Sequence, residues 1–345
     1  MKTTYRNLFL ALGIATLLLM LYNLNLTWEE ASALVRKAGF WLPACVALWL
    51  FIYLINAFAW SLIIRGRGDV NEDALSFGHI LKYTVTGYAL NYVTPAGVLG
   101  GEPYRIMELK PVLGTERAVS CVLLNSMMHI LSHFCFWAFC LFLVFVRCSY
   151  NMNPTLIAVI ALSSVFVVAG LYVFFKAYQG GVAERSVRWL VRLPLVGKYM
   201  SEWTRTHLKT LQIIDKQIIA LHQQNPWVFW ITLLSEFGAR VLGCLELLFV
   251  LSIFADSVSF VDCIMMQGFS SLVANLLFFI PMQLGVREAC MALFTSFNLA
   301  NGGYGMLAGL VIRIREIVWI TIGLCLMKMG NLPQTTVQQS NVRES

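Results

Sequence analysis

Residues 40–64 read FWLPACVALWLFIYLINAFAWSLII, a segment without a single charged side chain. About 20 apolar residues in an α-helix are enough to cross the roughly 30 Å hydrocarbon core of a bilayer. The segment therefore predicts a transmembrane helix. Five further apolar runs lie at 8–26, 118–146, 154–176, 227–254 and 303–327. All six runs are continuous rather than alternating, so they predict helices and not the strands of a barrel.

The composition supports the same interpretation. Hydrophobic residues make up 59% of the 345 positions and charged residues 12%, and the mean hydropathy is +0.72. A soluble domain carries about 25% charged residues. We therefore expect an all-α, polytopic membrane helix bundle over residues 1–330, followed by a disordered polar tail over 331–345. The net charge of +7 comes from basic residues in loops, which indicates positive-inside topology rather than binding to nucleic acid.

The cysteines and histidines give no metal-binding pattern. The nine cysteines lie mostly inside apolar runs and form no C-x-x-C pair. His129 and His133 are four residues apart on one predicted helix, which favours packing or a hydrogen bond between helices over a metal site. We expect no cofactor and no metal. Lys2 and Arg6 precede the first apolar run as in a signal sequence, but no small-x-small cleavage site follows, so we expect this run to be a retained span.

The loop at 177–226 fixes the predicted orientation. It contains seven basic residues, Arg185, Arg188, Arg192, Lys198, Arg205, Lys209 and Lys216. Cytoplasmic loops carry an excess of lysine and arginine. We therefore expect this loop in the cytoplasm, and counting spans from it places both termini of this cell-membrane protein there too. Arg36 and Lys37 conflict with the rule, because they fall in an outer loop beside Glu29 and Glu30.

Two other apolar stretches, 77–116 and 260–302, are interrupted by proline and glycine. The second limb of the first stretch, 102–116, is short and contains the charged residues Glu102, Arg105, Glu108 and Lys110. Charged backbone segments at membrane depth are tolerated only where protein buries them or water reaches them. The first stretch therefore predicts a re-entrant hairpin. The second predicts either a hairpin or two spans, because 260–280 alone is long enough to cross.

The two interruptions resemble each other in sequence. The first reads Asn91-Tyr-Val-Thr-Pro95-Ala-Gly-Val-Leu-Gly-Gly-Glu102, and the second runs from Asn275 through Pro281 and Gly285 to Glu288. In both, an asparagine precedes a proline, glycine follows, and a glutamate stands seven residues after the proline. Each half of the chain, 1–147 and 153–328, contains an odd number of net crossings, which predicts an inverted repeat. Paired interruptions of this kind indicate a transporter's midplane binding site, unless the likeness is a coincidence.

Charged residues inside the apolar runs cost about 2.5–3.5 kcal/mol each by insertion scales. They lie in both hairpins and in the runs 227–254 and 303–327, and they are Glu102, Arg105, Glu108, Glu236, Arg240, Glu246, Arg287, Glu288, Arg313, Arg315 and Glu316. Glu236 can pair with Arg240, and Arg313 with Glu316, along one helix face. Either the charges neutralise one another at helix interfaces, or they line a polar cavity. In such a cavity, arginine would suit bidentate contact with the phosphate of a lipid head group.

At these residues the chain resembles the membrane region of the lysylphosphatidylglycerol synthase/flippase family, over residues 5–328. The resemblance is carried by Asn91, Pro95, Gly100, Gly101, Glu102, Arg105, Pro281, Gly285 and Glu288. It implies lipid handling, because the family includes the lipid-translocating half of proteins that also make aminoacylated phosphatidylglycerol. No soluble transferase domain follows residue 330, so synthesis is not implied. Met282 and Gln283 stand where the family usually has a glycine pair.

We therefore expect a lipid flippase or transporter that moves an anionic or modified phospholipid head group. The expected substrate-binding or transport residues are Asn91, Pro95, Gly100, Gly101, Glu102, Arg105, Arg240, Pro281, Gly285, Arg287, Glu288, Arg313 and Glu316. Arginines would compensate the phosphate, and Glu102 and Glu288 would hold them or carry coupling protons. No Walker motif is present, so energy would come from a gradient or downhill flux. Expected partners are membrane lipids and a separate lipid-synthesising enzyme. The alternatives are a lipid-modifying transferase and a small-solute transporter.

Overall fold

The structure, a computed structural model, describes eight segments of the chain. They are residues 28–66, 75–93, 100–148, 154–179, 226–255, 258–277, 285–298 and 301–329, apart from two isolated positions. Several predicted features lie outside the described residues: the span at 8–26, most of the loop at 177–226, Pro95, Pro281 and the tail at 331–345. Within the described segments the regular structure is entirely helical, as predicted.

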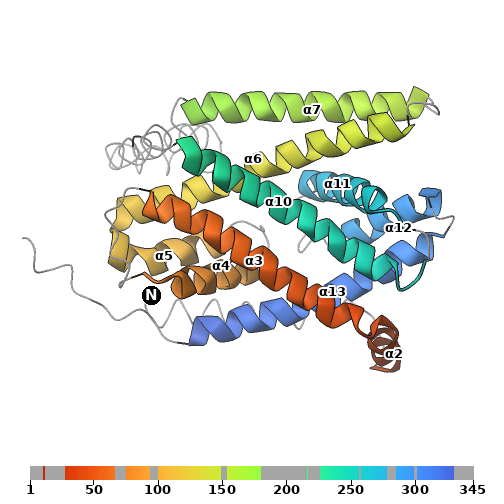
Figure 1. Ribbon diagram of the computed structural model, residues 1–345, viewed down its shortest axis with the longest axis horizontal. Coiled ribbons are helices and arrows are strands. Elements are labelled where there is room, and N and C mark those ends of the chain that lie inside the picture. Colours follow the sequence, from red (N-terminus) through yellow and green to blue (C-terminus); the bar gives the residue numbers. More distant parts are fainter. Residues whose placement is uncertain are drawn as a thin grey trace, which may run out of the picture.

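The described helices form one bundle (Figure 1). They are α2 (Trp28–Ala38), α3 (Trp41–Arg65), α4 (Phe77–Val93), α5 (Gly101–Leu113), α6 (Thr115–Cys148), α7 (Pro154–Gln179), α10 (Pro226–Leu251), α11 (Phe260–Leu276), α12 (Val286–Asn298) and α13 (Gly302–Lys328). α7 lies at the outer edge of the bundle alongside α6, and α2 lies at one end beside α3 and α13.

The two interrupted stretches each contain two short helices. α4 and α11 are 17 residues long, and α5 and α12 are 13 residues long. At 1.5 Å per residue, 13 residues rise only about 20 Å, less than the thickness of the hydrocarbon core. The amide of Gly101 begins α5 by donating to Asn91 Oδ1 at 2.8 Å, and Gly285 precedes α12 with φ of +78°. The asparagine and glycine of the motifs thus stand at helix ends.

Packing connects the two halves of the chain closely. α3 packs against α10, and α4 packs against α13. α11, the counterpart of α4 in the predicted repeat, packs against α6, the counterpart of α13. The short helices α5 and α12 contact α6 and α13, the long helices that follow them. Because of this packing, charged residues on the short helices lie inside the bundle.

The bundle is apolar outside and charged inside. Leu162 and Leu234 are 74% and 71% exposed, whereas Arg315 and Glu316 are each 1% exposed. Soluble proteins show the reverse, with arginine and glutamate among the least buried residues. By length and composition alone, two described helices could cross a membrane, Trp41–Arg65 and the Thr115–Arg147 part of α6. α10 and α13 are as long, but they contain buried charged residues, which are Glu236 and Glu246 on α10 and Arg313, Arg315 and Glu316 on α13.

Candidate functional site

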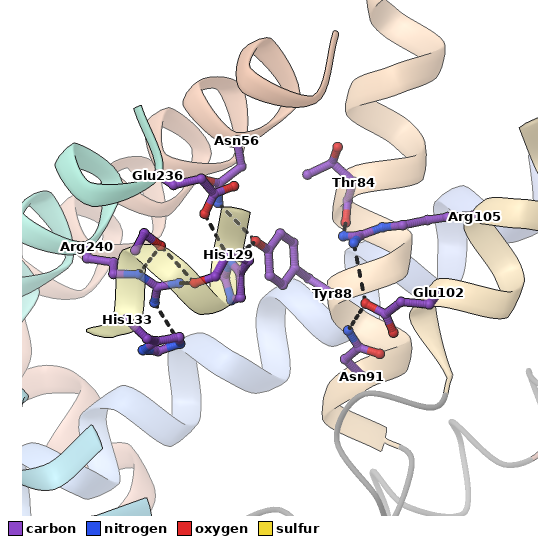
Figure 2. A network of polar contacts seen from close by, with 11 residues as sticks. Asn56, Thr84, Tyr88, Asn91, Glu102, Arg105, His129, His133, Glu236 and Arg240 are labelled. Carbon is purple, nitrogen blue, oxygen red and sulfur yellow. Dashed lines mark hydrogen bonds and ion pairs between the residues drawn. The ribbon is translucent and has the colours of Figure 1, made fainter. Parts of the chain in front are cut away.

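Two clusters of polar side chains lie inside the bundle. The first, here the histidine network, joins α3, α4, α5, α6 and α10 (Figure 2). It consists of Asn56, Thr84, Tyr88, Asn91, Glu102, Arg105, His129, Ser132, His133, Glu236 and Arg240. The second, here the ion-pair network, joins α3, α10, α12 and α13. It consists of Trp49, Glu246, Arg287, Glu288, Arg313, Arg315 and Glu316.

Among the residues that the structure describes, Arg240 in the histidine network has only neutral hydrogen-bond acceptors. Its Nε donates to Ser132 Oγ, and one terminal nitrogen donates to the carbonyl oxygen of His129, both at 2.8 Å. The other terminal nitrogen lies 2.8 Å from His133 Nε2. The sequence suggested that Arg240 pairs with Glu236 one turn earlier, and that prediction is wrong. The side chains of α6 reach both residues and bind each separately.

Glu236 bonds instead to a histidine of α6. Its Oε2 lies 2.9 Å from His129 Nδ1, and its Oε1 is buried and has no hydrogen-bond partner within the described segments. The same histidine nitrogen lies 3.4 Å from the hydroxyl of Tyr88, which accepts from Asn56 Nδ2 at 3.3 Å. Figure 2 shows Tyr88 between this group and the side chains of α5. A hydrogen bond between helices, as predicted, is thus confirmed for His129.

Arg105 lies on the other side of Tyr88. Its guanidinium stacks on the rings of Trp60 and Tyr88, with the central carbon 5.2 and 5.0 Å from their centroids. Such contacts are worth about 0.5–2 kcal/mol, most when desolvated. One terminal nitrogen donates to the Thr84 carbonyl at 3.4 Å, and the other lies 3.7 Å from Glu102 Oε1. The Nε has no hydrogen-bond partner in the described part of the chain, so aromatic rings and weak polar contacts are the main interactions that place Arg105 there.

Glu102 is held by the interrupted stretch itself. Its Oε1 accepts from Asn91 Nδ2 at 3.2 Å, and its buried Oε2 has no hydrogen-bond partner among the residues described. Glycine is required nearby on both helices. A Cβ on Gly101 would lie 2.3 Å from the Gly87 carbonyl oxygen, and a Cβ on Gly87 would lie 2.4 Å from Arg105 Nε. The close approach of α4 and α5 at these glycines brings Asn91, Glu102 and Arg105 together.

In the ion-pair network, by comparison, every arginine contacts a carboxylate. Arg313 Nε contacts Glu288 Oε1 at 2.7 Å, and Arg313 also contacts Glu316 at 2.8 Å. The predicted pairing of Arg313 with Glu316 is therefore confirmed. Arg287 contacts the other oxygen of Glu316 at 3.2 Å. A Cβ on Gly309 would lie 2.7 Å from the Cγ of Glu288, so this glycine makes room for the carboxylate.

Arg315 forms the innermost pair of this network. Its Nε and one terminal nitrogen contact the two oxygens of Glu246 at 2.6 and 2.8 Å. The guanidinium also lies 4.0 Å from the ring centroid of Trp49, whose Nε1 donates to Glu246 at 2.9 Å. Two parallel bonds to one carboxylate are the strongest arrangement available to an arginine. This pair fastens α13 to α10 and α3.

The predicted site residues therefore divide between the networks. Asn91, Gly100, Gly101, Glu102, Arg105 and Arg240 belong to or adjoin the histidine network, and Gly285, Arg287, Glu288, Arg313 and Glu316 belong to or adjoin the ion-pair network. The prediction omitted the central residues of both, Tyr88, His129, His133, Glu236, Glu246 and Arg315. The charges and the i, i+4 histidines were visible in the sequence, but their partners lie on distant helices. Among the described residues, no three His, Cys, Asp or Glu side chains could hold a metal ion.

Residues 8–323 match the family described as the lysylphosphatidylglycerol synthase TM region. The chain belongs to this family. The resemblance drawn from the motifs is thereby confirmed, and the family's transmembrane character establishes the bundle as a membrane protein. The exposed apolar side chains of α7 and α10 accordingly form surface suited to lipid. No curated protein and no solved structure matched the chain in the same comparisons.

Proposed function

We propose that the protein moves a phospholipid with an anionic or modified head group across the cell membrane, and that the histidine network holds the head group. The observation that carries the proposal is the binding of Arg240. This partly buried guanidinium meets only neutral acceptors among the described residues. Its positive charge is therefore not cancelled by direct contact with a carboxylate.

The arginines of the two networks differ in how closely they contact carboxylates. Arg105 has one carboxylate contact, at 3.7 Å, whereas Arg315 donates two hydrogen bonds shorter than 3 Å to Glu246. A phosphate competes best for a guanidinium whose planar fork is not already matched to a carboxylate. Arg105 and Arg240 are thus the cationic groups proposed for head-group binding. Arg315 is structural in this proposal.

The architecture supports movement of the lipid with its tails in the bilayer. The outer surface is apolar while the charges lie inside. The matching 17- and 13-residue helices and the packing of α4 on α13 and of α11 on α6 support the inverted repeat and the two re-entrant hairpins. Rocking of such halves about a central site is a common transport mechanism. Both termini face the cytoplasm in this proposal.

The proposal is tested with purified protein in liposomes that contain a trace of fluorescently labelled phosphatidylglycerol. The wild type should speed exchange of the label between leaflets. Arg240→Gln and Arg105→Lys should each reduce the rate by about tenfold or more, equivalent to about 1.4 kcal/mol or more. Lysine keeps the charge of Arg105 but loses the fork. Lys110→Gln, at an exposed position on α5, is the matched control and should exchange the label at the wild-type rate.

Thermal stability of each variant in detergent separates transport defects from unfolding. Unchanged exchange in stable Arg240→Gln protein would remove Arg240 from the site. No acceleration by the wild type, with several anionic lipids, would contradict the transport function itself. A chemically altered lipid, detected by mass spectrometry, would instead favour a transferase.

A further inference from the structure

We infer that the His129–Glu236 pair binds one proton together with each anionic head group, so that lipid and proton move in the same direction. The inference rests on the proposed function and adds the coupling ion and the group that carries it. Neither residue was among the predicted site residues. The geometry that leads to it is the hydrogen bond of 2.9 Å between His129 Nδ1 and Glu236 Oε2 in the middle of the bundle.

The hydrogen-bond partners determine which histidine can take the proton. An arginine can only donate, so His133 Nε2, 2.8 Å from Arg240, must be an unprotonated acceptor. A charged His133 would lose this bond and face a like charge. His129 has the opposite situation, because its Nδ1 faces the carboxylate of Glu236. A carboxylate accepts only, so Nδ1 carries a hydrogen. Nε2 of the neutral ring has no hydrogen-bond partner among the described residues and can bind a proton.

Exposure gives the proton a route. The side chain of His129 is 35% exposed, whereas that of Glu236 is 2% exposed. A proton therefore reaches the imidazole before the buried carboxylate. Binding at Nε2 forms an imidazolium that still donates from Nδ1 to Glu236, and no other bond is broken. Because the two groups are in direct contact, the proton belongs to the pair and not to either residue alone.

Charge balance connects the proton to the lipid. Before proton uptake, the carboxylates Glu102 and Glu236 offset the guanidinium groups of Arg105 and Arg240, and both histidines are neutral. One proton on His129 gives the network a net positive charge. A head group with one negative charge then restores neutrality, which is the least costly state inside a membrane. Proton and lipid therefore favour each other's binding, and the reciprocity is thermodynamic.

The groups around the pair come from every helix near it. They are Tyr88 of α4 and the neutral Asn56 of α3, Arg105 and Glu102 of α5, His133 of α6, and Arg240 of α10; Arg287 of α12 acts on His133. The remaining helices add little: the charged residues of α7 and α11 are Lys176 and Asp262, near the helix ends, and Arg313, Arg315 and Glu316 of α13 belong to the ion-pair network.

The test measures an equilibrium rather than a rate. Proteoliposomes with trace labelled phosphatidylglycerol are given a pH gradient, and the final ratio of label between leaflets is recorded. One proton per monoanionic lipid predicts about tenfold enrichment of label in the more alkaline leaflet for each pH unit. A membrane potential set with potassium and valinomycin should not change the ratio. A pH-sensitive dye inside the liposomes should report proton entry that depends on movement of the lipid. In the control, a protonophore lets protons enter without any lipid movement.

Variants of the histidine network test whether the transported proton binds to the His129–Glu236 pair. Glu236→Gln and His129→Gln should bring the leaflet ratio to about one at every gradient, because a proton no longer accompanies the lipid. His133→Gln retains an acceptor for Arg240 and should keep the wild-type ratio, whatever its rate. Enrichment by Glu236→Gln equal to that of the wild type would overturn the inference. A wild type that moves the label but never enriches it would also overturn the inference while leaving the transport function intact.

Histidine-selective NMR of the detergent-solubilised protein gives an answer that does not depend on transport. The chain has five histidines, and the signals missing from His129→Gln and His133→Gln identify the two in the network. The chemical shift of the His129 signal should change with pH as the ring takes up a proton. The His133 signal should stay that of a neutral ring over the same pH range. A His129 ring that stays neutral throughout would refute proton binding by the pair, even if no lipid is moved. Failure of the wild type to move lipid, with titration of His129 intact, would count against the transport function and against coupling.

Discussion

The histidine network and the ion-pair network contain the same kinds of charge but bind their arginines differently. Each arginine of the ion-pair network lies within 3.2 Å of a carboxylate. Arg240 has neutral acceptors instead, and Arg105 lies 3.7 Å from its carboxylate. Matched ion pairs are costly to separate inside a membrane, whereas weakly paired guanidinium groups can exchange partners. The ion-pair network therefore holds the helices of the bundle together, whereas the weaker pairing in the histidine network leaves its arginines available to the head group proposed above.

The largest expected effect is loss of stability when the innermost ion pair is broken. Glu246→Gln removes the charge that binds Arg315 through two bonds. Leaving a buried partner uncompensated costs about 3–5 kcal/mol. We expect a marked fall in the thermal unfolding midpoint in detergent. The double variant Glu246→Leu/Arg315→Leu should recover much of the loss, and a single variant as stable as the wild type would contradict the structural role of this network.

The two motif glutamates should then differ from each other. Glu288→Gln weakens a 2.7 Å contact with Arg313 and should cost about 1–3 kcal/mol, as for hydrogen bonds to charged groups. Glu102→Gln affects a 3.7 Å contact and should cost less than about 1 kcal/mol. Both variants should lose lipid exchange in liposomes, Glu102→Gln because Glu102 lies beside Arg105 in the proposed site, and Glu288→Gln because a weaker contact with Arg313 loosens α12 on α13. Equal loss of stability in the two would show that the networks are alike, and wild-type exchange by the double variant would show that transport needs neither glutamate.

The sequence predicted the helices and their interruptions because apolar length and proline or glycine punctuation are local signals. The helix end at Val93 and the start at Gly101 follow from the motif beside them. The pairing of Arg313 with Glu316 was also local, three residues apart on one helix. The partner of Glu236 was not, because His129 lies 107 residues away along the chain. Only the packing of α6 on α10 decides that contact, and residue spacing contains no information about it.

A smaller effect on stability, but a specific effect on transport, is expected for Gly87→Ala. The new Cβ would lie 2.4 Å from Arg105 Nε, so the guanidinium must move away from its stacking position on Tyr88. A misplacement of about 1 Å can cost about a hundredfold in rate, and we expect exchange to fall by about ten- to a hundredfold. Gly78→Ala on the same helix is the matched control, because its Cβ would approach only Ser76 Oγ, at 3.7 Å. Equal rates for the two variants would contradict the role of Arg105.

The smallest expected effect concerns Gly238, which lies on α10 between Glu236 and Arg240. A Cβ there would meet nothing within 4 Å among the described residues. Alanine is favoured over glycine inside a helix by about 0.8–1 kcal/mol, so Gly238→Ala should raise the unfolding midpoint slightly. We expect unchanged lipid exchange, because both flanking side chains keep their partners on α6. A stabilised variant with slow exchange would instead mean that α10 bends at Gly238 during transport. The histidine network would then open by deformation of one helix, and not by rigid movement of one half against the other.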